Sequence, residues 1–115
     1  MRHHNANRKL SRVRKVRKAL INSLARSLVL HQKIETTEPK AKELRPFIEK
    51  LVTKSRVASV TNRRAINEKI GAKATKILVD TLAKKYEKRN GGYTRITKIK
   101  RRMSDGSKMA IIEFI

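Results

Sequence analysis

Basic side chains gather at the start of the chain, where residues 1–18 contain eight Lys and Arg side chains and no acidic one. At this density, cations neutralise phosphates and release condensed counterions with little dependence on nucleotide sequence. Arginine predominates, and its guanidinium binds phosphate through paired hydrogen bonds and stacks on exposed bases. The stretch therefore predicts contact with nucleic acid, and with structured RNA in particular. The eight residues are Arg2, Arg8, Lys9, Arg12, Arg14, Lys15, Arg17 and Lys18.

The charge of the whole chain supports the same interpretation. Its 115 residues include 31 Lys and Arg against 9 Asp and Glu, a formal net charge of +22. A free globule with this charge repels itself, so a polyanionic partner is expected. Apolar residues make up 38% of the chain and recur periodically, which argues against a wholly disordered basic tail. The length allows one modest core and no second one.

Three absences narrow the function classes. The chain contains no cysteine, which excludes disulfides and thiolate metal sites and favours a reducing, cytoplasmic compartment. No apolar run approaches the roughly 18 to 20 residues of a membrane span. The nine acids are dispersed, and no nucleophile has an evident paired base, so we expect neither an enzyme nor a small-molecule substrate.

Metal and cofactor binding are not expected either. His3, His4 and His31 have no accompanying carboxylate or cysteine cluster, so His3 and His4 are interpreted as RNA contacts. Gly91-Gly92 lacks the spacing of a phosphate-binding loop and predicts a turn.

The four aromatic residues form no stacking platform of the kind found in single-strand binders. Phe47 and Phe114 have apolar neighbours and are expected in the core. For Tyr93, which follows two glycines, a core position and an RNA contact remain equally open. Beyond the eight N-terminal cations and the two histidines, the candidate RNA-binding residues are Arg26, Lys40, Arg63, Arg64, Tyr93, Arg95, Arg101 and Arg102.

The first predicted element is a helix from about residue 11 to residue 31, with Ser11 as its N-cap. A strand is expected over residues 33–37, from its β-branched composition. On the helix, an apolar stripe is formed by Val13, Val16, Leu20, Leu24 and Leu28, and the opposite face carries Arg8, Arg12, Lys15, Lys18, Asn22 and Arg26. One side is thus predicted to dock on the core while the other meets an anion.

Three further helices follow. The second starts at Thr37-Glu38-Pro39, with Leu44, Phe47, Ile48, Leu51 and Val52 facing inward and a kink at Pro46. The third covers residues 56–70, with Val57, Val60, Ile66 and Ile70 inward, and ends at Gly71. The fourth runs from about residue 72 to residue 88, with Ala74, Ile77, Leu78, Leu82 and Tyr86 on its inner face.

The C-terminal part predicts a hairpin with arms at residues 93–100 and 109–115 and a turn around residues 104–107. Ala110, Ile112 and Phe114 share one face, whereas Tyr93, Ile96 and Ile99 lie three apart, which suggests either a bulge or a short first strand. The expected fold class is α+β, a two-layer arrangement with about four helices packed on a small sheet of one early strand plus the hairpin. Residues 1–10 are interpreted as a basic N-terminal extension and residues 11–115 as a single globular RNA-binding domain.

Several of these segments resemble the family of bacterial large-subunit ribosomal protein seventeen. The most specific are Thr36-Thr37 followed by Pro39-Lys40-Ala41-Lys42-Glu43-Leu44-Arg45, and Gly91-Gly92-Tyr93-Thr94-Arg95-Ile96. Met1-Arg2-His3, Arg8-Lys9-Leu10, Arg17-Lys18-Ala19, Asn62-Arg63-Arg64 and Met109-Ala110 also fit, in the same order along the whole chain. The chain departs from the family pattern at Asn7, where Gly is usual, and at Val16, where His is usual.

The resemblance implies a structural component of the large (50S) ribosomal subunit that binds 23S rRNA and supports subunit assembly and translation. It further implies a ribosome-bound position near the polypeptide exit tunnel, with neighbouring ribosomal proteins that include large-subunit protein thirty-two. Two other classes remain open on the residues alone. One is a DNA-binding nucleoid or regulatory protein that reads DNA through the Arg63-Arg64 region, and the other is a basic amphipathic helix on anionic lipid.

Overall fold

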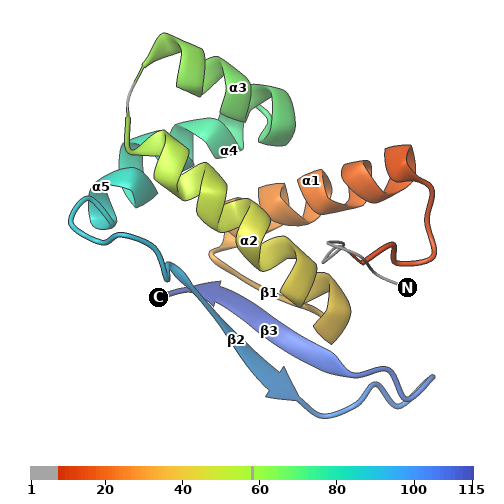
Figure 1. Cartoon of the computed structure of the whole chain (residues 1–115). Coiled ribbons are helices and arrows are strands. Elements are labelled where there is room, and N and C mark those ends of the chain that lie inside the picture. The colour runs from red at the N-terminus through yellow and green to blue at the C-terminus, as the bar shows by residue number, and fades with distance from the viewer. Residues whose placement is uncertain (1–7, 58) are drawn as a thin grey trace, which may run out of the picture.

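The computed structural model of the chain describes residues 8–57 and 59–115 (Figure 1). Helices and strands follow in the order α1 (Arg14–His31), β1 (Lys33–Thr37), α2 (Glu38–Ser55), α3 (Val60–Ile70), α4 (Ala72–Ile77), η1 (Leu78–Leu82), α5 (Ala83–Lys85), β2 (Thr94–Ile99) and β3 (Met109–Phe114). The predicted fold class, α+β with helices on a small sheet, is confirmed, and the early strand occupies the predicted residues. The helix expected from residue 72 onwards ends at Lys85 and includes a π-helical turn, η1.

The three strands form one antiparallel sheet in the order β1-β3-β2, so the last strand of the chain lies in the middle. Ile112 pairs with Ile34 on one side and with Ile96 on the other. Alternate residues of a strand point to opposite faces, so Ala110, Ile112 and Phe114 share one face, and all three are buried. That face meets the helices.

The bulge considered for β2 is wrong. Pairing between β2 and β3 runs without interruption from Thr94 opposite Phe114 to Ile99 opposite Met109. Ile96 therefore lies on the helix-covered face and Ile99 on the other. The three-residue spacing that suggested a bulge comes from apolar residues on two different faces of a regular strand.

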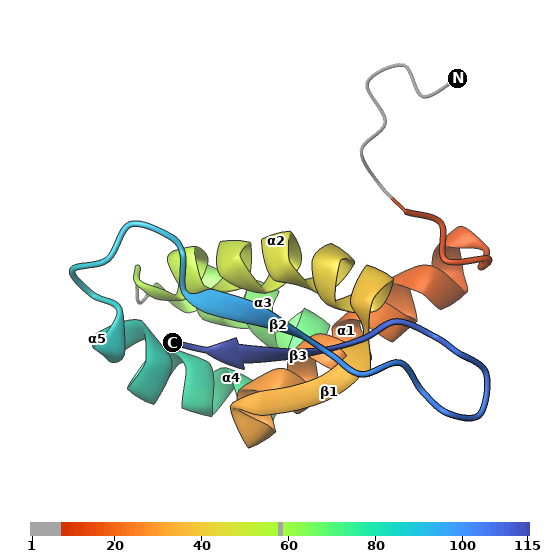
Figure 2. The same ribbon diagram turned by 90° about the horizontal axis from the view of Figure 1, so that it is seen from below.

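The helices form the second layer, on one face of the sheet (Figures 1 and 2). α2 contacts all three strands and α1 contacts β1, while α3 and α4 pack against α1 and its neighbours. Every residue predicted inward on α2 is buried except Phe47, which is half-buried. Pro46 lies within α2 without ending it, and its ring is exposed.

α3 begins four residues later than expected. Ser59 is its N-cap, and its hydroxyl accepts a hydrogen bond from the Asn62 amide at 3.1 Å. Val57 and Val60, expected inward, are exposed, whereas Ile66 and Ile70 are buried as predicted. Gly71 ends the helix at φ 85° and ψ 165°, a conformation that essentially only glycine adopts, and α4 begins at the next residue.

Candidate nucleic-acid interface

The N-terminal half of α1 projects beyond the core and carries several basic side chains. The helix begins at Arg14, with Val13 as an N-cap that makes no side-chain hydrogen bond. Ser11, expected as the cap, lies three residues before the helix with φ 55°. The buried residues of α1 all lie from Ile21 onwards. Its first two turns are therefore held away from the sheet and present side chains to solvent.

The apolar stripe predicted for α1 is wrong at its N-terminal end. Val13 and Val16 are 70% and 51% exposed, while Ile21, Ala25, Leu28 and Val29 form the buried face. Apolar residues cover a broad arc around this helix. The part of the arc that packs against the core is rotated about the helix axis relative to the stripe that was predicted to be buried. Leu20 and Leu24 lie at its edge and are only partly buried.

Seven of the predicted RNA-binding cations lie on this helix or just before it and make no ion pair among the described residues. Arg12 is bound to the Leu10 carbonyl, and the other six also donate no side-chain hydrogen bond there. Of these six, Arg17 is half-exposed and the other five are exposed. Because no acid in residues 8–57 and 59–115 neutralises them, their charge is available to an external anion. The six are Lys9, Arg14, Lys15, Arg17, Lys18 and Arg26.

A groove of about 360 Å³ runs between this part of α1 and the middle of α2. Its apolar floor comprises Ile21, Pro46 and Phe47. Its cationic lining includes Lys50, which is not among the residues predicted from the sequence, since only the crossing of two helices brings it beside the α1 cations. The full lining is Arg14, Arg17, Lys18, Ile21, Asn22, Glu43, Pro46, Phe47 and Lys50.

The single acid in the groove lining is already neutralised. Glu43 Oε2 lies 3.4 Å from both the backbone nitrogen and Nη1 of Arg8. This contact also ties the start of the described chain to α2. The groove thus retains the net positive charge of its four lining cations.

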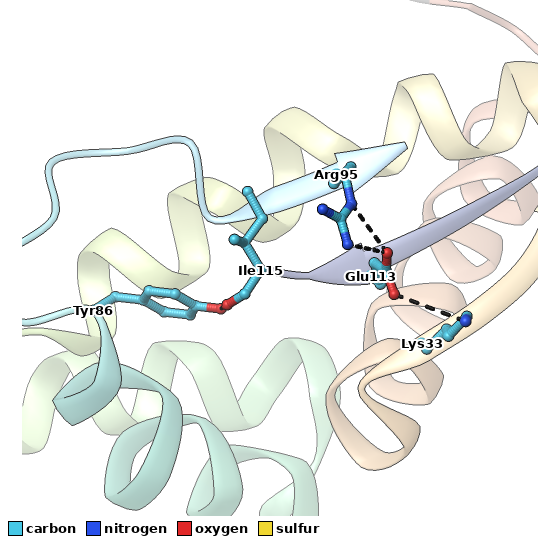
Figure 3. A network of polar contacts seen from close by, with 5 residues as sticks. All are labelled: Lys33, Tyr86, Arg95, Glu113 and Ile115. Carbon is cyan, nitrogen blue, oxygen red and sulfur yellow. Dashed lines mark hydrogen bonds and ion pairs between the residues drawn. The ribbon is translucent and has the colours of Figure 1, made fainter. Parts of the chain in front are cut away.

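Other predicted cations form ion pairs with acidic side chains of the same chain. Arg95 donates to Glu113 Oε1 from Nε at 3.1 Å and from Nη2 at 2.7 Å, and Lys33 Nζ lies 3.9 Å from the second oxygen (Figure 3). The hydrogen bonds from Arg95 lower the pKa of Glu113 below its ordinary 4.5, and the charge of Lys33 adds to this. Arg63 and Arg102 pair with Asp80 and Asp105 at 3.8 and 3.3 Å.

Arg8, Arg63, Arg95 and Arg102 thus each share their charge with an acid, which leaves less of it for an external phosphate. The remaining predicted cations are more accessible. Arg64 and Arg101 are exposed and Lys40 is half-buried. Arg12 is half-buried, with Nη1 donating to the Leu10 carbonyl at 2.7 Å. Arg2, His3 and His4 lie outside the described residues.

Tyr93 occupies the core, one of the two positions left open by the sequence. Its side chain is 0% exposed, and its ring centroid lies 5.1 Å from that of Tyr86. Its hydroxyl lies 3.1 Å from Thr53 Oγ1, 3.3 Å from Arg56 Nη1 and 3.1 Å from the Arg89 carbonyl. Burial opposes ionisation of this hydroxyl, but the hydrogen bonds from Thr53 and Arg56 outweigh it and lower the pKa of Tyr93. The buried ring is not available for stacking on RNA.

A metal-binding cluster and a helix that could span a membrane are both absent from the described residues. Within residues 8–57 and 59–115, no three His, Asp or Glu side chains gather closely enough to hold a metal ion. Among the helices described, none has both the length and the apolar character needed to cross a bilayer.

Fold and surface together define a small, strongly basic α+β protein whose projecting first helix carries several cations with no acid partner among the described residues. A family model described as ribosomal protein L17 matches residues 20–115. Full-length relatives agree with this match. The large ribosomal subunit protein bL17 of Nautilia profundicola is 46% identical over 100% of this chain and 98% of its own length. That of Aliarcobacter butzleri is 49% identical over 100% of both chains, and that of Chlorobium chlorochromatii is 49% identical over 94% of this chain and 71% of its own. The chain belongs to the ribosomal protein L17 family.

Proposed function

We propose that the chain is a non-catalytic structural constituent of the large ribosomal subunit and binds 23S rRNA through the projecting part of α1. The observation that supports this most strongly is the set of six cations that have neither an acid partner nor a side-chain hydrogen bond among the described residues. Five of them lie on α1, whose C-terminal half is fixed in the core, and Lys9 lies just before it. Cations held on a rigid scaffold meet phosphates at defined positions, whereas those on a flexible tail do so at the cost of ordering the tail.

The contact set follows from this division. The principal contacts are Lys9, Arg14, Lys15, Arg17, Lys18 and Arg26. Secondary contacts are Arg2, His3, His4, Arg12, Lys40, Arg64 and Arg101. The smallest contribution comes from the arginines that are paired with an acid, which are Arg8, Arg63, Arg95 and Arg102. We retain residues 1–10 as an extension of the domain formed by residues 11–115. Arg8 and the partly buried Leu10, which packs against the core, would anchor it.

The family resemblance supports a finer proposal. The protein, bound to cytoplasmic ribosomes, would contribute to subunit assembly near the polypeptide exit tunnel, beside large-subunit protein thirty-two. Chemical crosslinking of purified large subunits, followed by mass spectrometry, tests this position. Crosslinks to protein thirty-two are expected, and crosslinks only to proteins remote from the tunnel exit would contradict it.

Charge-matched variants test the role of α1. In the α1 variant, Arg14, Lys15, Lys18 and Arg26 are changed to Gln. In the control variant, Lys73, Lys76, Lys84 and Lys88, which are also exposed and without an ion pair among the described residues, are changed to Gln. Both variants carry four fewer positive charges, so nonspecific attraction falls equally.

Affinity for 23S rRNA fragments and sedimentation with large subunits in high-magnesium gradients are then measured for both variants. We expect the α1 variant to bind more weakly than the control variant while keeping its circular dichroism spectrum. Equal losses of affinity would show that the net charge, not the helix, determines binding. Wild-type protein that sediments apart from large subunits and co-purifies with chromosomal DNA would contradict the proposed function itself.

A further inference from the structure

The groove between α1 and α2 combines cations with an apolar floor, which is more than phosphate binding requires. A phosphate group needs hydrogen-bond donors and positive charge, and the exposed outer face of α1 already supplies these. The groove adds Ile21, Pro46 and the half-buried Phe47 to a lining that also contains the cations Arg14, Arg17, Lys18 and Lys50. Aromatic and apolar surface flanked by cations is the chemistry that receives an unstacked base with its adjoining phosphates.

The size and charge of the groove fit this occupant. Its volume of about 360 Å³ lies at the small end of the range for ligand pockets, about 300 to 1,000 Å³. Glu43 is paired with Arg8, so it does not cancel the lining cations. Lys69 from α3 does not line the groove; its Nζ lies over the Phe47 ring, 5.4 Å from the centroid.

Asn22 supplies an unused hydrogen-bonding group at the same place. It lines the groove, and its Oδ1 is buried with no hydrogen-bond partner in residues 8–57 and 59–115. A buried acceptor left unsatisfied destabilises a protein, so the side chain gains free energy if a donor reaches it. Rotation of the amide about the Cβ–Cγ bond exchanges its oxygen and nitrogen ends. A bound base can then offer an amino or imino N–H to the oxygen.

We propose that this groove is a binding site for a single nucleobase extruded from folded rRNA, with Phe47 as the contact surface and Asn22 as the polar contact to the base edge. The proposal rests on the proposed function, because it assigns one site within the RNA-binding surface. Arg14, Arg17, Lys18 and Lys50 would hold the phosphates on either side of that base. The site would thus add a base contact to a surface that otherwise recognises only the RNA backbone.

Nucleotide titration tests the site on the full chain without any assumption about the rRNA. Isotope-labelled protein is titrated with each of the four ribonucleoside 5′-monophosphates, and with ribose 5-phosphate as the matched ligand that lacks a base. We expect the nucleotides to shift the NMR signals of the Phe47 ring and the Asn22 side-chain amide, and ribose 5-phosphate to leave the ring signals in place. Equal shifts from ribose 5-phosphate would mean an anion site only and would overturn the proposal. Absence of shifts at both residues would overturn it as well.

Two single variants test the site on the RNA itself. Phe47→Leu keeps an apolar side chain in the floor, and Asn22→Leu removes the amide at similar volume, with Asn67→Leu on α3 as the matched control. Removal of a stacking surface weakens binding about 5-fold to 100-fold, and we expect Phe47→Leu to fall in this range. The salt dependence of its affinity should be unchanged, because the variant keeps every cation that binds phosphate. We expect Asn22→Leu to weaken binding more than Asn67→Leu does. Wild-type affinity in Phe47→Leu and Asn22→Leu would contradict the base site and leave RNA binding by α1 intact.

A photo-crosslinking amino acid at position 50 identifies the occupant in the particle. Incorporation into large subunits is measured first, and its failure would count against the proposed function. In incorporated protein, attachment to one rRNA nucleotide supports the base site. Attachment to a peptide of a neighbouring ribosomal protein would overturn it.

Discussion

At the scale of single residues, the structure separates cations that are paired with an acid from cations that have no acid partner among the described residues. The sequence alone treats Arg95 and Lys15 alike, since both are basic and both are candidate RNA-binding residues. Arg95 is bound to Glu113 across two strands, and Lys15 has no acid partner among the described residues. The difference depends on pairing between residues 18 positions apart, which no local pattern reveals.

The Glu113 ion pair predicts a defined dependence of stability on pH. Hydrogen bonds from Arg95 lower the folded-state pKa of Glu113 below the ordinary 4.5, so folding favours the charged carboxylate. Its contribution to the free energy of unfolding is therefore complete above pH 4.5 and disappears as the pH falls further, through the folded-state pKa. We expect Glu113→Gln to be less stable than wild type at neutral pH and closer to it near pH 3, as measured by urea denaturation.

Glu68→Gln provides the control for this series, because Glu68 is exposed and makes no ion pair within residues 8–57 and 59–115. Its difference from wild type should stay nearly constant over the same pH range. A constant difference for Glu113→Gln as well would mean that the pair with Arg95 does not stabilise the fold.

At the scale of elements, the periodicity of apolar residues predicted the positions of helices and strands along the chain. It predicted less well which face of each element is buried. β1 covers the expected residues, and α2 buries its predicted face. The apolar residues of α1 include Leu20, Ile21, Leu24, Leu28 and Val29. The buried face predicted for α1 is wrong because these residues cover so broad an arc that two different stripes fit the sequence. Only the crossing of α1 with α2 and the sheet selects one of them. The groove could not be predicted for the same reason.

Two valines on α1 test this orientation with the same chemical change. Val29 is 0% exposed, so Val29→Ala leaves a cavity and should reduce the free energy of unfolding by roughly 2 kcal/mol. Val16 is exposed, so Val16→Ala should stay within about 0.5 kcal/mol of wild type, helped by the higher helix propensity of Ala. Urea denaturation measures both. If Val16→Ala destabilised the protein as much as Val29→Ala, Val16 would belong to the buried face, as the sequence predicted.

Gly71 connects α3 to α4 with no other intervening residue, and its positive φ makes the junction sensitive to substitution. A Cβ at this position would meet no atom within 4 Å, so any cost of Gly71→Ala comes from the backbone conformation. We expect a decrease of about 1 to 3 kcal/mol in the free energy of unfolding. Ala72→Ser, at the exposed next residue, should cost less. Equal stability of Gly71→Ala and wild type would contradict the strained junction.

At the scale of the whole molecule, the fold class and family were within reach of the sequence, whereas the strand order was not. The sequence indicated one early strand and a late hairpin, but it did not show that β3 lies between β1 and β2. This order makes the C-terminal strand the centre of the sheet and places its apolar face against α2. The helical layer then fixes α1 so that its first turns project from the body.

The salt dependence of binding to 23S rRNA fragments shows whether α1 is the rRNA-binding element. If about six to ten phosphates are neutralised, affinity should fall by roughly 10³ to 10⁵ between 50 and 200 mM salt. The α1 variant should show a slope of log affinity against log salt that is shallower by about 0.9 for each phosphate that it no longer neutralises, and the control variant should keep the wild-type slope. A flat profile for wild-type protein, or the same slope in both variants, would contradict the claim that α1 is the rRNA-binding element.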